Sequence, residues 1–132
     1  MTPTPEPFVR RFVLLEHRWD GVHWDFMLES DGGLRTWAID EPIAPETILP
    51  ARALDDHRPI YLDYEGPVSG GRGTVLRVDR GTYAVSEWTE DRVRVRVAGG
   101  QLVGEVLLWK LPLESSGPGR MNWKFRLVGN AD

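Results

Sequence analysis

Two histidines and an aspartate follow one another closely near the start of the chain, as His17, His23 and Asp25. Imidazole nitrogens and carboxylate oxygens bind divalent transition metals, and the sequence has no cysteine to supply a thiolate instead. Two histidines and one carboxylate leave coordination positions open, which is typical of catalytic sites. The ligand types fit Mn²⁺, Zn²⁺ and Fe²⁺. The sequence therefore predicts a metal centre on these three residues.

The turn between the two histidines decides whether the three side chains meet. His23 and Asp25 are two positions apart on a predicted strand, so they share a face. A two-residue turn would place His17 on the opposite face. A three-residue loop over 19–21 pairs His17 with His23, and Gly21 suits the left-handed position at its end. We expect this longer loop; the alternative is a surface hairpin with two solvated histidines.

A second segment with residues that could take part in catalysis surrounds the third histidine, His57. Asp55 and Asp56 precede it and Tyr61 follows it by four residues. Neighbouring carboxylates favour the protonated imidazole. A protonated histidine and a tyrosine hydroxyl near a bound anion can stabilise developing charge or donate a proton. The alternative is a solvated loop histidine with no role.

The elements that must position these residues are predicted to be strands. Apolar or alternating runs separated by turn residues predict strands over 8–15, 22–29, 34–39, 73–78, 82–87, 92–97, 101–111 and 122–128. A turn is predicted at 79–81. The proline-rich stretch 42–58 is predicted to be an irregular insertion with a helical turn over 50–56. The fold class is all-β, a small closed or partly closed antiparallel barrel of about eight strands.

Composition limits the remaining possibilities. The 132 residues suffice for one domain, expected over 8–132 after a disordered lead-in over 1–7. A net charge of −4 gives no overall attraction to nucleic acid. The absence of cysteine, of a signal-like segment and of any long apolar run predicts a cytoplasmic protein without a membrane partner. We also expect a monomer.

Taken together, these motifs resemble the 3′-phosphoesterase domain of bacterial DNA ligase D and its stand-alone relatives. The resemblance covers roughly residues 8–128, and the order of its motifs is more specific than any one of them. The matching features are Glu16-His17, His23-Trp24-Asp25, Leu28-Glu29, Trp37-Ala38, the ungapped stretch from Asp56-His57 to Glu65-Gly66, Gly73-Thr74-Val75, Asp79-Arg80-Gly81 and Trp123.

The resemblance implies a function as well as a fold. It implies a compact β-barrel with a Mn²⁺-type site on His17, His23 and Asp25, with Zn²⁺ or Co²⁺ as alternatives, and phosphate-side roles for His57 and Tyr61. The family removes 3′-phosphates and 3′-terminal ribonucleotides from DNA ends before repair synthesis and ligation. The expected partners are therefore a DNA or RNA-tailed DNA 3′ end and a separate ligase or polymerase.

The chain departs from the family pattern at two charged positions. Met27 stands where the family has the phosphate-binding arginine of His-x-Asp-x-Arg, and Glu41 stands where it has a lysine. Loss of an arginine that clamps a phosphate predicts weakened turnover. Arg18, Arg52 and Arg58 are candidates to replace it.

Two other functions fit parts of the pattern. A non-catalytic relative would keep metal and DNA-end binding while Met27 abolishes turnover. A 2-His-1-carboxylate Fe(II) oxygenase would use His23, Asp25 and His57, which leaves His17 without a role.

Overall fold

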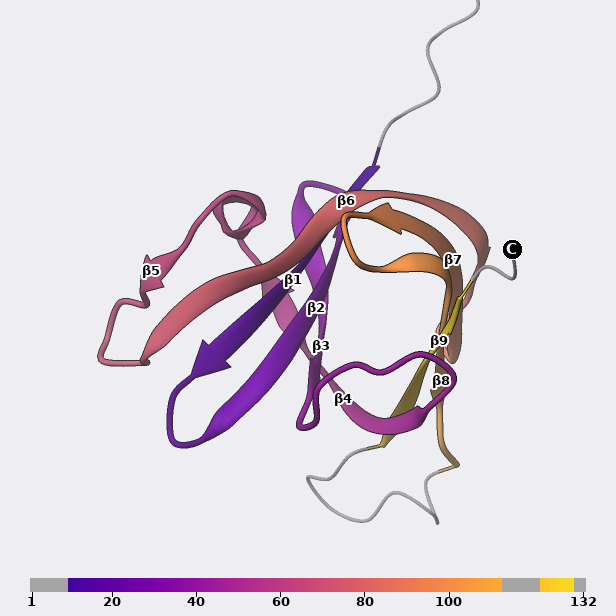
Figure 1. Cartoon of the computed structure of the whole chain (residues 1–132), viewed down its shortest axis with the longest axis horizontal. Helices are drawn as coiled ribbons and strands as arrows, with labels where there is room; N and C mark the ends of the chain where they lie inside the picture. The colour runs from indigo at the N-terminus through magenta and orange to yellow at the C-terminus, as the bar shows by residue number, and fades with distance from the viewer. Residues whose placement is uncertain (1–9, 113–121, 130–132) are drawn as a thin grey trace, which may run out of the picture.

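The computed structural model describes residues 10–112 and 122–129. Their strands form one antiparallel sheet in the order β1-β2-β3-β4-β9-β8-β7-β6-β5, and a further pairing of β1 with β6 closes eight of them into a barrel (Figure 1). The predicted all-β barrel is therefore confirmed. The strands are β1 (Arg10–Arg18), β2 (Val22–Ser30), β3 (Gly33–Ile39), β4 (Ile48–His57), β5 (Gly66–Pro67), β6 (Thr74–Trp88), β7 (Arg92–Gly99), β8 (Val103–Lys110) and β9 (Trp123–Gly129).

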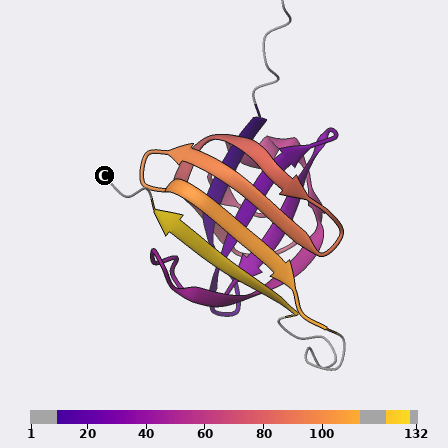
Figure 2. The same ribbon diagram turned by 90° about the vertical axis from the view of Figure 1, so that its right-hand side faces the viewer.

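The interior of the barrel is apolar and comes from alternate residues of every long strand. Figure 2 shows β7, β8 and β9 crossing in front of β1, β2 and β3, and the side chains between these layers form the main core. Its largest members include Phe12, Phe26, Trp37 and Phe125, each at most 1% exposed.

A smaller second core lies on the outer face of β1, β2 and β3. It is formed by Val13, Leu15, Met27, Leu34, Leu62 and Val75. The covering segment, which we define as residues 58–73, contributes Leu62 from a single 3₁₀ turn, η1 (Pro59–Leu62). Because both faces of β1 are covered, Phe12-Val13-Leu14-Leu15 is apolar at every position instead of alternating.

Two predictions about local structure are wrong. The stretch predicted as an irregular insertion with a helical turn over 50–56 contains strand β4, whose Leu49 and Ala51 point into the core. Burial of alternate residues outweighs the local signal of Pro50, which pairs with Lys124 of β9. The short helical turn lies at Pro59–Leu62 instead.

The predicted turn at 79–81 lies inside β6, which is one strand and not two. Asp79 is 7% exposed, and its carboxylate accepts hydrogen bonds from the backbone N–H groups of Arg80, Gly100, Gln101 and Leu102. This aspartate thus ties β6 to the β7–β8 connection rather than ending a strand. Residues 1–7 and the first two residues of the predicted strand 8–15 lie outside the described residues.

Candidate metal centre and cleft

The β1–β2 hairpin has the register that brings its two histidines together. His17 pairs with His23 and Arg18 pairs with Val22, so the loop has three residues as predicted. Asp20 and Gly21 adopt positive φ angles of 53° and 106°. Glycine accepts this conformation without a steric penalty, which favours the loop that ends at Gly21.

Three ligand atoms converge beside this hairpin on the outer face of the barrel. Nδ1 of His17 lies 3.5 Å from Oδ2 of Asp25, and Nε2 of His23 lies 3.1 Å from Oδ1. One ligand atom from each residue falls within 4.8 Å of the others. Asp25 is 1% exposed, and although Nε2 of His23 is close to its Oδ1, this oxygen accepts no hydrogen bond. A buried carboxylate oxygen without a donor, facing two imidazoles, fits the donor set of a divalent metal.

A backbone carbonyl orients His17. Nε2 of His17 lies 2.7 Å from the carbonyl oxygen of Arg72, so this nitrogen donates its hydrogen there and Nδ1 is left to face Asp25. Histidine ligands commonly donate their second N–H to such a carbonyl, which sets the tautomer and the ring orientation. Arg72 therefore takes part through its backbone.

Glycine at position 73 lets the Arg72 carbonyl reach His17. Gly73 has φ +79°, and a Cβ there would collide with the carbonyl oxygen of Arg18 and lie 2.6 Å from Cβ of Trp19. The covering segment can pass this close to the end of β1 only without a side chain at that position. Sequence reasoning missed Arg72; the run of glycines around it was its only local signal.

The pKa values of His17 and Asp25 depart from their ordinary values because of the contacts around Asp25. The hydrogen bond to Asp25 raises the pKa of His17 above its ordinary 6.5; burial opposes this, and the Arg72 carbonyl supports it. Burial pushes the pKa of Asp25 up, but its contacts with His17 and His23 bring it below the ordinary 3.8. The lowered pKa of Asp25 favours its ionised form, and the raised pKa of His17 favours its protonated form.

His57 and Tyr61 face the same cleft from the other side. The pairing of β3 with β4 shifts between Leu34 and Thr36, so that Leu34 lies opposite His57 and Thr36 lies opposite Leu54. This bulge places Leu54 and His57 on the same face although they are three positions apart. Nδ1 of His57 lies 2.9 Å from the carbonyl oxygen of Asp55, and its ring centroid lies 5.8 Å from that of Tyr61.

All five residues predicted for the site line one cleft of about 710 Å³. The remaining lining residues come from the hairpin loop, β2, β4, β6 and the covering segment: Trp19, Met27, Arg52, Leu54, Asp55, Asp56, Arg58, Val68, Ser69, Arg72 and Val75. The cleft therefore joins the histidine–aspartate group to the segment around His57. Trp19 was not predicted; it is 49% exposed and its ring stacks at 6.0 Å from that of His17.

The positions that depart from the family pattern have different surroundings. Met27 lines the cleft but is 1% exposed and packs in the second core. Glu41 is exposed and does not line the cleft. Of the three candidate arginines, Arg52 and Arg58 line the cleft, whereas Arg18 does not line it and contacts Glu16 at 3.4 Å.

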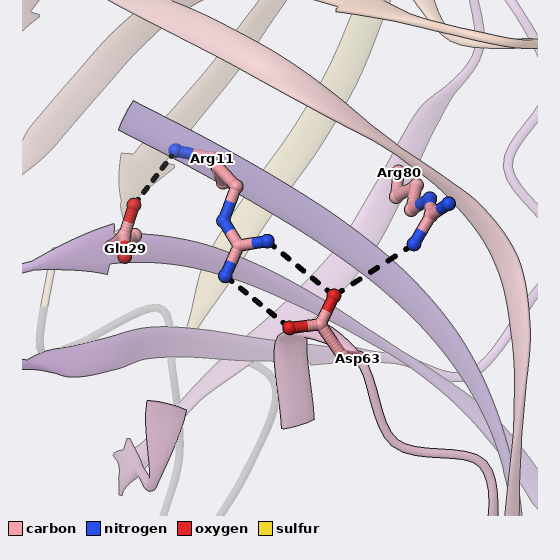
Figure 3. A network of polar contacts seen from close by, with 4 residues as sticks. All are labelled: Arg11, Glu29, Asp63 and Arg80. Atoms are coloured by element: carbon pink, nitrogen blue, oxygen red, sulfur yellow. Dashed lines mark hydrogen bonds and ion pairs between the residues drawn. The ribbon is translucent and has the colours of Figure 1, made fainter. Parts of the chain in front are cut away.

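The covering segment is attached to the barrel by a small charge network. Figure 3 shows Asp63, directly after η1, between the guanidinium groups of Arg11 on β1 and Arg80 on β6. The distances are 3.4 Å to Arg11 and 3.7 Å to Arg80, and the backbone N–H of Arg11 also donates to Glu29 at 3.1 Å. These contacts hold η1, and with it Tyr61, against the barrel.

The structure does not assemble the ligand set of the oxygenase hypothesis. Among the residues that the structure describes, the only group of metal-ligating side chains consists of His17, His23 and Asp25, and His57 is not part of it. The same described part of the chain contains no helix that is long and apolar enough to span a membrane.

Comparison with known proteins identifies the family to which this chain is similar. The model of the DNA ligase D 3′-phosphoesterase domain family matches residues 15–110, a range that contains all five predicted site residues. The chain is similar to the multifunctional non-homologous end joining DNA repair protein LigD of Mycobacterium tuberculosis, with 32% identity over 123 residues that cover 81% of this chain and 16% of that protein.

A second similar protein is the multifunctional non-homologous end joining protein LigD of Pseudomonas aeruginosa, with 33% identity over 95 residues, 61% of this chain and 11% of that protein. The chain thus spans about a sixth or less of the length of these relatives. A family match over most of the barrel, together with the histidine–aspartate group, shows that this chain belongs to the DNA ligase D 3′-phosphoesterase domain family.

Proposed function

We propose that this protein is a divalent-metal-dependent phosphoesterase that acts on the 3′ ends of DNA, removing a 3′-phosphate or a 3′-terminal ribonucleotide. The observation that carries the proposal is the meeting of Asp25, His17 and His23 in the same cleft as His57 and Tyr61. Family membership supports the reaction class and a role in the processing of DNA ends.

His17, His23 and Asp25 would hold the metal, with Mn²⁺ favoured over Zn²⁺ and Co²⁺. When bound, a divalent ion supplies Lewis-acid stabilisation of the phosphoryl oxygens. The protein's part is to keep Nδ1 of His17 and Nε2 of His23 turned toward Asp25, which the Arg72 carbonyl supports at His17.

His57 and Tyr61 would act on the phosphoryl group. In hydrolysis, a water oxygen forms a bond to phosphorus, the bond from phosphorus to the 3′ oxygen breaks, and that oxygen takes up a proton. The hydrogen bond between Nδ1 of His57 and the Asp55 carbonyl orients the ring. Its imidazolium form can then donate from Nε2 to the leaving oxygen, and the Tyr61 hydroxyl can hold a phosphoryl oxygen.

Trp19 supports a nucleic-acid substrate. Its indole is 49% exposed at the tip of the hairpin, beside the metal ligand His17, and it lines the cleft. An exposed aromatic ring next to a phosphate site can stack on a terminal base, an interaction worth roughly 1–3 kcal/mol per base. This contact does not depend on the net charge of −4.

The direct test is release of phosphate from a 3′-phosphorylated primer–template by the protein with Mn²⁺. We expect release that is abolished by a chelator, absent from a 5′-phosphorylated strand of the same sequence, and lost in His57→Gln. A second substrate, a DNA strand that ends in one ribonucleotide, tests the other activity. No release from either substrate by folded, Mn²⁺-bound protein would contradict the proposal.

That negative result would favour a second function, a non-catalytic module that binds metal and DNA ends. One observation favours it: Met27, beside Asp25 on the same face, is uncharged and buried in the second core. The two functions separate when binding of the 3′-phosphorylated end and its turnover are measured on one sample.

A further inference from the structure

We propose that Arg52 is the cation that holds the substrate's terminal phosphoryl group in this cleft. The inference rests on the proposed function and adds to it the residue that anchors the anion. It comes from the position of Arg52 on the sheet, from the absence of a partner for its guanidinium among the described residues, and from the charges around it.

Arg52 lies in register with the metal ligand Asp25. Asp25 on β2 pairs with Ala38 on β3, and Ala38 pairs with Arg52 on β4. Directly paired residues point to the same face of a sheet, and two strand spacings separate their backbones by roughly 10 Å. Ala38 adds no polar group between them. The guanidinium and the metal ligands therefore share the outer face of the barrel and line the same cleft.

The guanidinium of Arg52 has a buried nitrogen, Nε, that lacks a hydrogen-bond partner. Within residues 10–112 and 122–129, its guanidinium forms no ion pair, even though Asp55 and Asp56 line the same cleft. A guanidinium that lines a cleft without an ion pair points to an anionic ligand, which its terminal nitrogens would contact from the cleft side.

Two other arginines have partners for their guanidinium groups. Nε of Arg126 is also buried without a partner, but its guanidinium contacts Glu46 at 3.3 Å. Arg72, which also lines the cleft, donates from its guanidinium to the Ser69 carbonyl and hydroxyl oxygens. Among the described residues, Arg52 is thus the half-buried arginine of the cleft whose side chain forms neither an ion pair nor a hydrogen bond.

The positive charges on the two sides of the cleft, the proposed metal ion and the Arg52 guanidinium, favour an anionic ligand. A divalent cation at His17, His23 and Asp25 and a guanidinium across the cleft repel each other unless an anion lies between them. A phosphate monoester has oxygens for both sides, and the planar guanidinium can contact two of them at once. A neutral ligand would leave both cations unpaired.

Arg58 is the matched control. It lines the same cleft and carries the same charge, but its side chain is exposed to solvent. Solvent screens an exposed guanidinium, so its loss costs less than the loss of a half-buried one. If charge alone draws phosphate to the cleft, the two arginines will be equivalent; if Arg52 is the anchor, they will differ.

The experiment measures binding of inorganic phosphate to the Mn²⁺-loaded protein by calorimetry for wild type, Arg52→Gln, Arg52→Lys and Arg58→Gln. We expect Arg52→Gln to weaken phosphate binding by roughly tenfold or more, the size expected for a lost charge-assisted hydrogen bond. Arg52→Lys should recover part of it, because the charge remains without the planar fork. Arg58→Gln should bind phosphate nearly as wild type does, and Mn²⁺ affinity should stay unchanged in all three.

Failure of this inference is distinguishable from failure of the proposed function. Phosphate binding that is equal in wild type and Arg52→Gln, or absent from both, would overturn the role of Arg52 whether or not the protein turns over DNA ends. Loss of phosphate binding in Arg52→Gln, in a protein that releases no phosphate, would support Arg52 and contradict the proposed function. With activity present, the KM for a 3′-phosphorylated strand should rise in Arg52→Gln more than kcat falls.

Discussion

We call His17, His23 and Asp25 the metal half of the cleft, and Arg52, His57 and Tyr61 the anion half, after the roles proposed for them. The metal half comes from one hairpin, whereas the anion half is assembled from β4 and the covering segment. The first is fixed by a three-residue loop and by mutual contacts of 3.1–3.5 Å. The second depends on a bulge in β4 and on a segment attached partly by exposed ion pairs. Local register thus builds the metal half, and long-range packing builds the anion half.

The largest effect should follow from removing a ligand in the metal half. Asp25→Asn removes the charge that both imidazoles face, so metal affinity should fall by more than the roughly 10–100-fold typical of changes to groups that only support the ligands. His57→Gln, in the anion half, should leave metal affinity unchanged and lower kcat. Calorimetric titration with Mn²⁺ measures the metal affinity of both variants, and phosphate release measures kcat. Equal losses of Mn²⁺ affinity in the two variants would show that the division into halves is wrong.

The second-largest loss of Mn²⁺ affinity is expected from a change at the contact between the hairpin and the covering segment. Gly73→Ala combines a positive φ with a collision against the Arg18 carbonyl, so it should displace the Arg72 carbonyl from His17. We expect Mn²⁺ affinity to fall roughly 10–100-fold. Gly71→Ala is the matched control, because Gly71 also has a positive φ, +68°, but a Cβ there meets nothing within 4 Å. If the two variants lose affinity equally, backbone strain and not the carbonyl is responsible.

The sequence sufficed for the metal half because its information is local. The spacing of His17, Gly21 and His23 favours a three-residue loop that brings the histidines to one face, and the structure has that loop. The carbonyl of Arg72 could not be predicted, since its contact with His17 joins residues 55 positions apart. The bulge that turns His57 toward the cleft was missed for a related reason, because Pro50 hid the strand whose burial pattern appears only when β4 pairs with its neighbours.

An intermediate effect should appear when the uncharged position beside Asp25 is changed. Met27→Arg adds a second cation to the cleft, so kcat/KM for a 3′-phosphorylated strand should rise, while the free energy of unfolding should fall by about 1–3 kcal/mol because Met27 is packed in the second core. Met27→Leu keeps the packing without the charge and should change neither quantity much. Unchanged or lower kcat/KM in folded Met27→Arg would show that this position no longer faces the phosphate.

Protonation of His17 and Asp25 should make the free energy of unfolding of the metal-free protein depend moderately on pH. The pKa of His17 is raised by Asp25, so its stabilisation is present below pH 6.5 and is lost as the pH rises through the raised folded-state value. Burial opposes ionisation of Asp25, but the imidazoles lower its pKa, so its stabilisation is present above pH 3.8 and is lost as the pH falls through the lowered value.

The contribution of His17 and Asp25 to the free energy of unfolding should therefore be largest between pH 3.8 and 6.5. Urea denaturation at a series of pH values, with a chelator present, measures it. His17→Gln should flatten the profile on the alkaline side of that window, and a profile identical to wild type would contradict the assignment. Metal affinity should change in the opposite sense and rise with pH, because the ion must displace the proton of His17.

The smallest effect is expected at the attachment of the covering segment. Asp63→Asn removes the exposed ion pairs with Arg11 and Arg80 (Figure 3), which are worth about 0–1 kcal/mol. We expect a slight loss of stability, a small rise in KM and no change in Mn²⁺ affinity. Glu87→Gln, which loses a 4.0 Å contact with Arg92 away from the cleft, is the control for loss of a surface charge. A large loss of Mn²⁺ affinity in Asp63→Asn would mean that the covering segment holds the metal half as well.

The most direct test of the account is a crystal structure of the protein grown with Mn²⁺ and phosphate, with anomalous diffraction recorded at the manganese absorption edge. We expect one anomalous peak bounded by Nδ1 of His17, Nε2 of His23 and the Asp25 carboxylate, and a phosphate between that peak and the guanidinium of Arg52. A peak elsewhere, or a phosphate held without Arg52, would contradict the claim that the two halves of the cleft meet on one phosphoryl group.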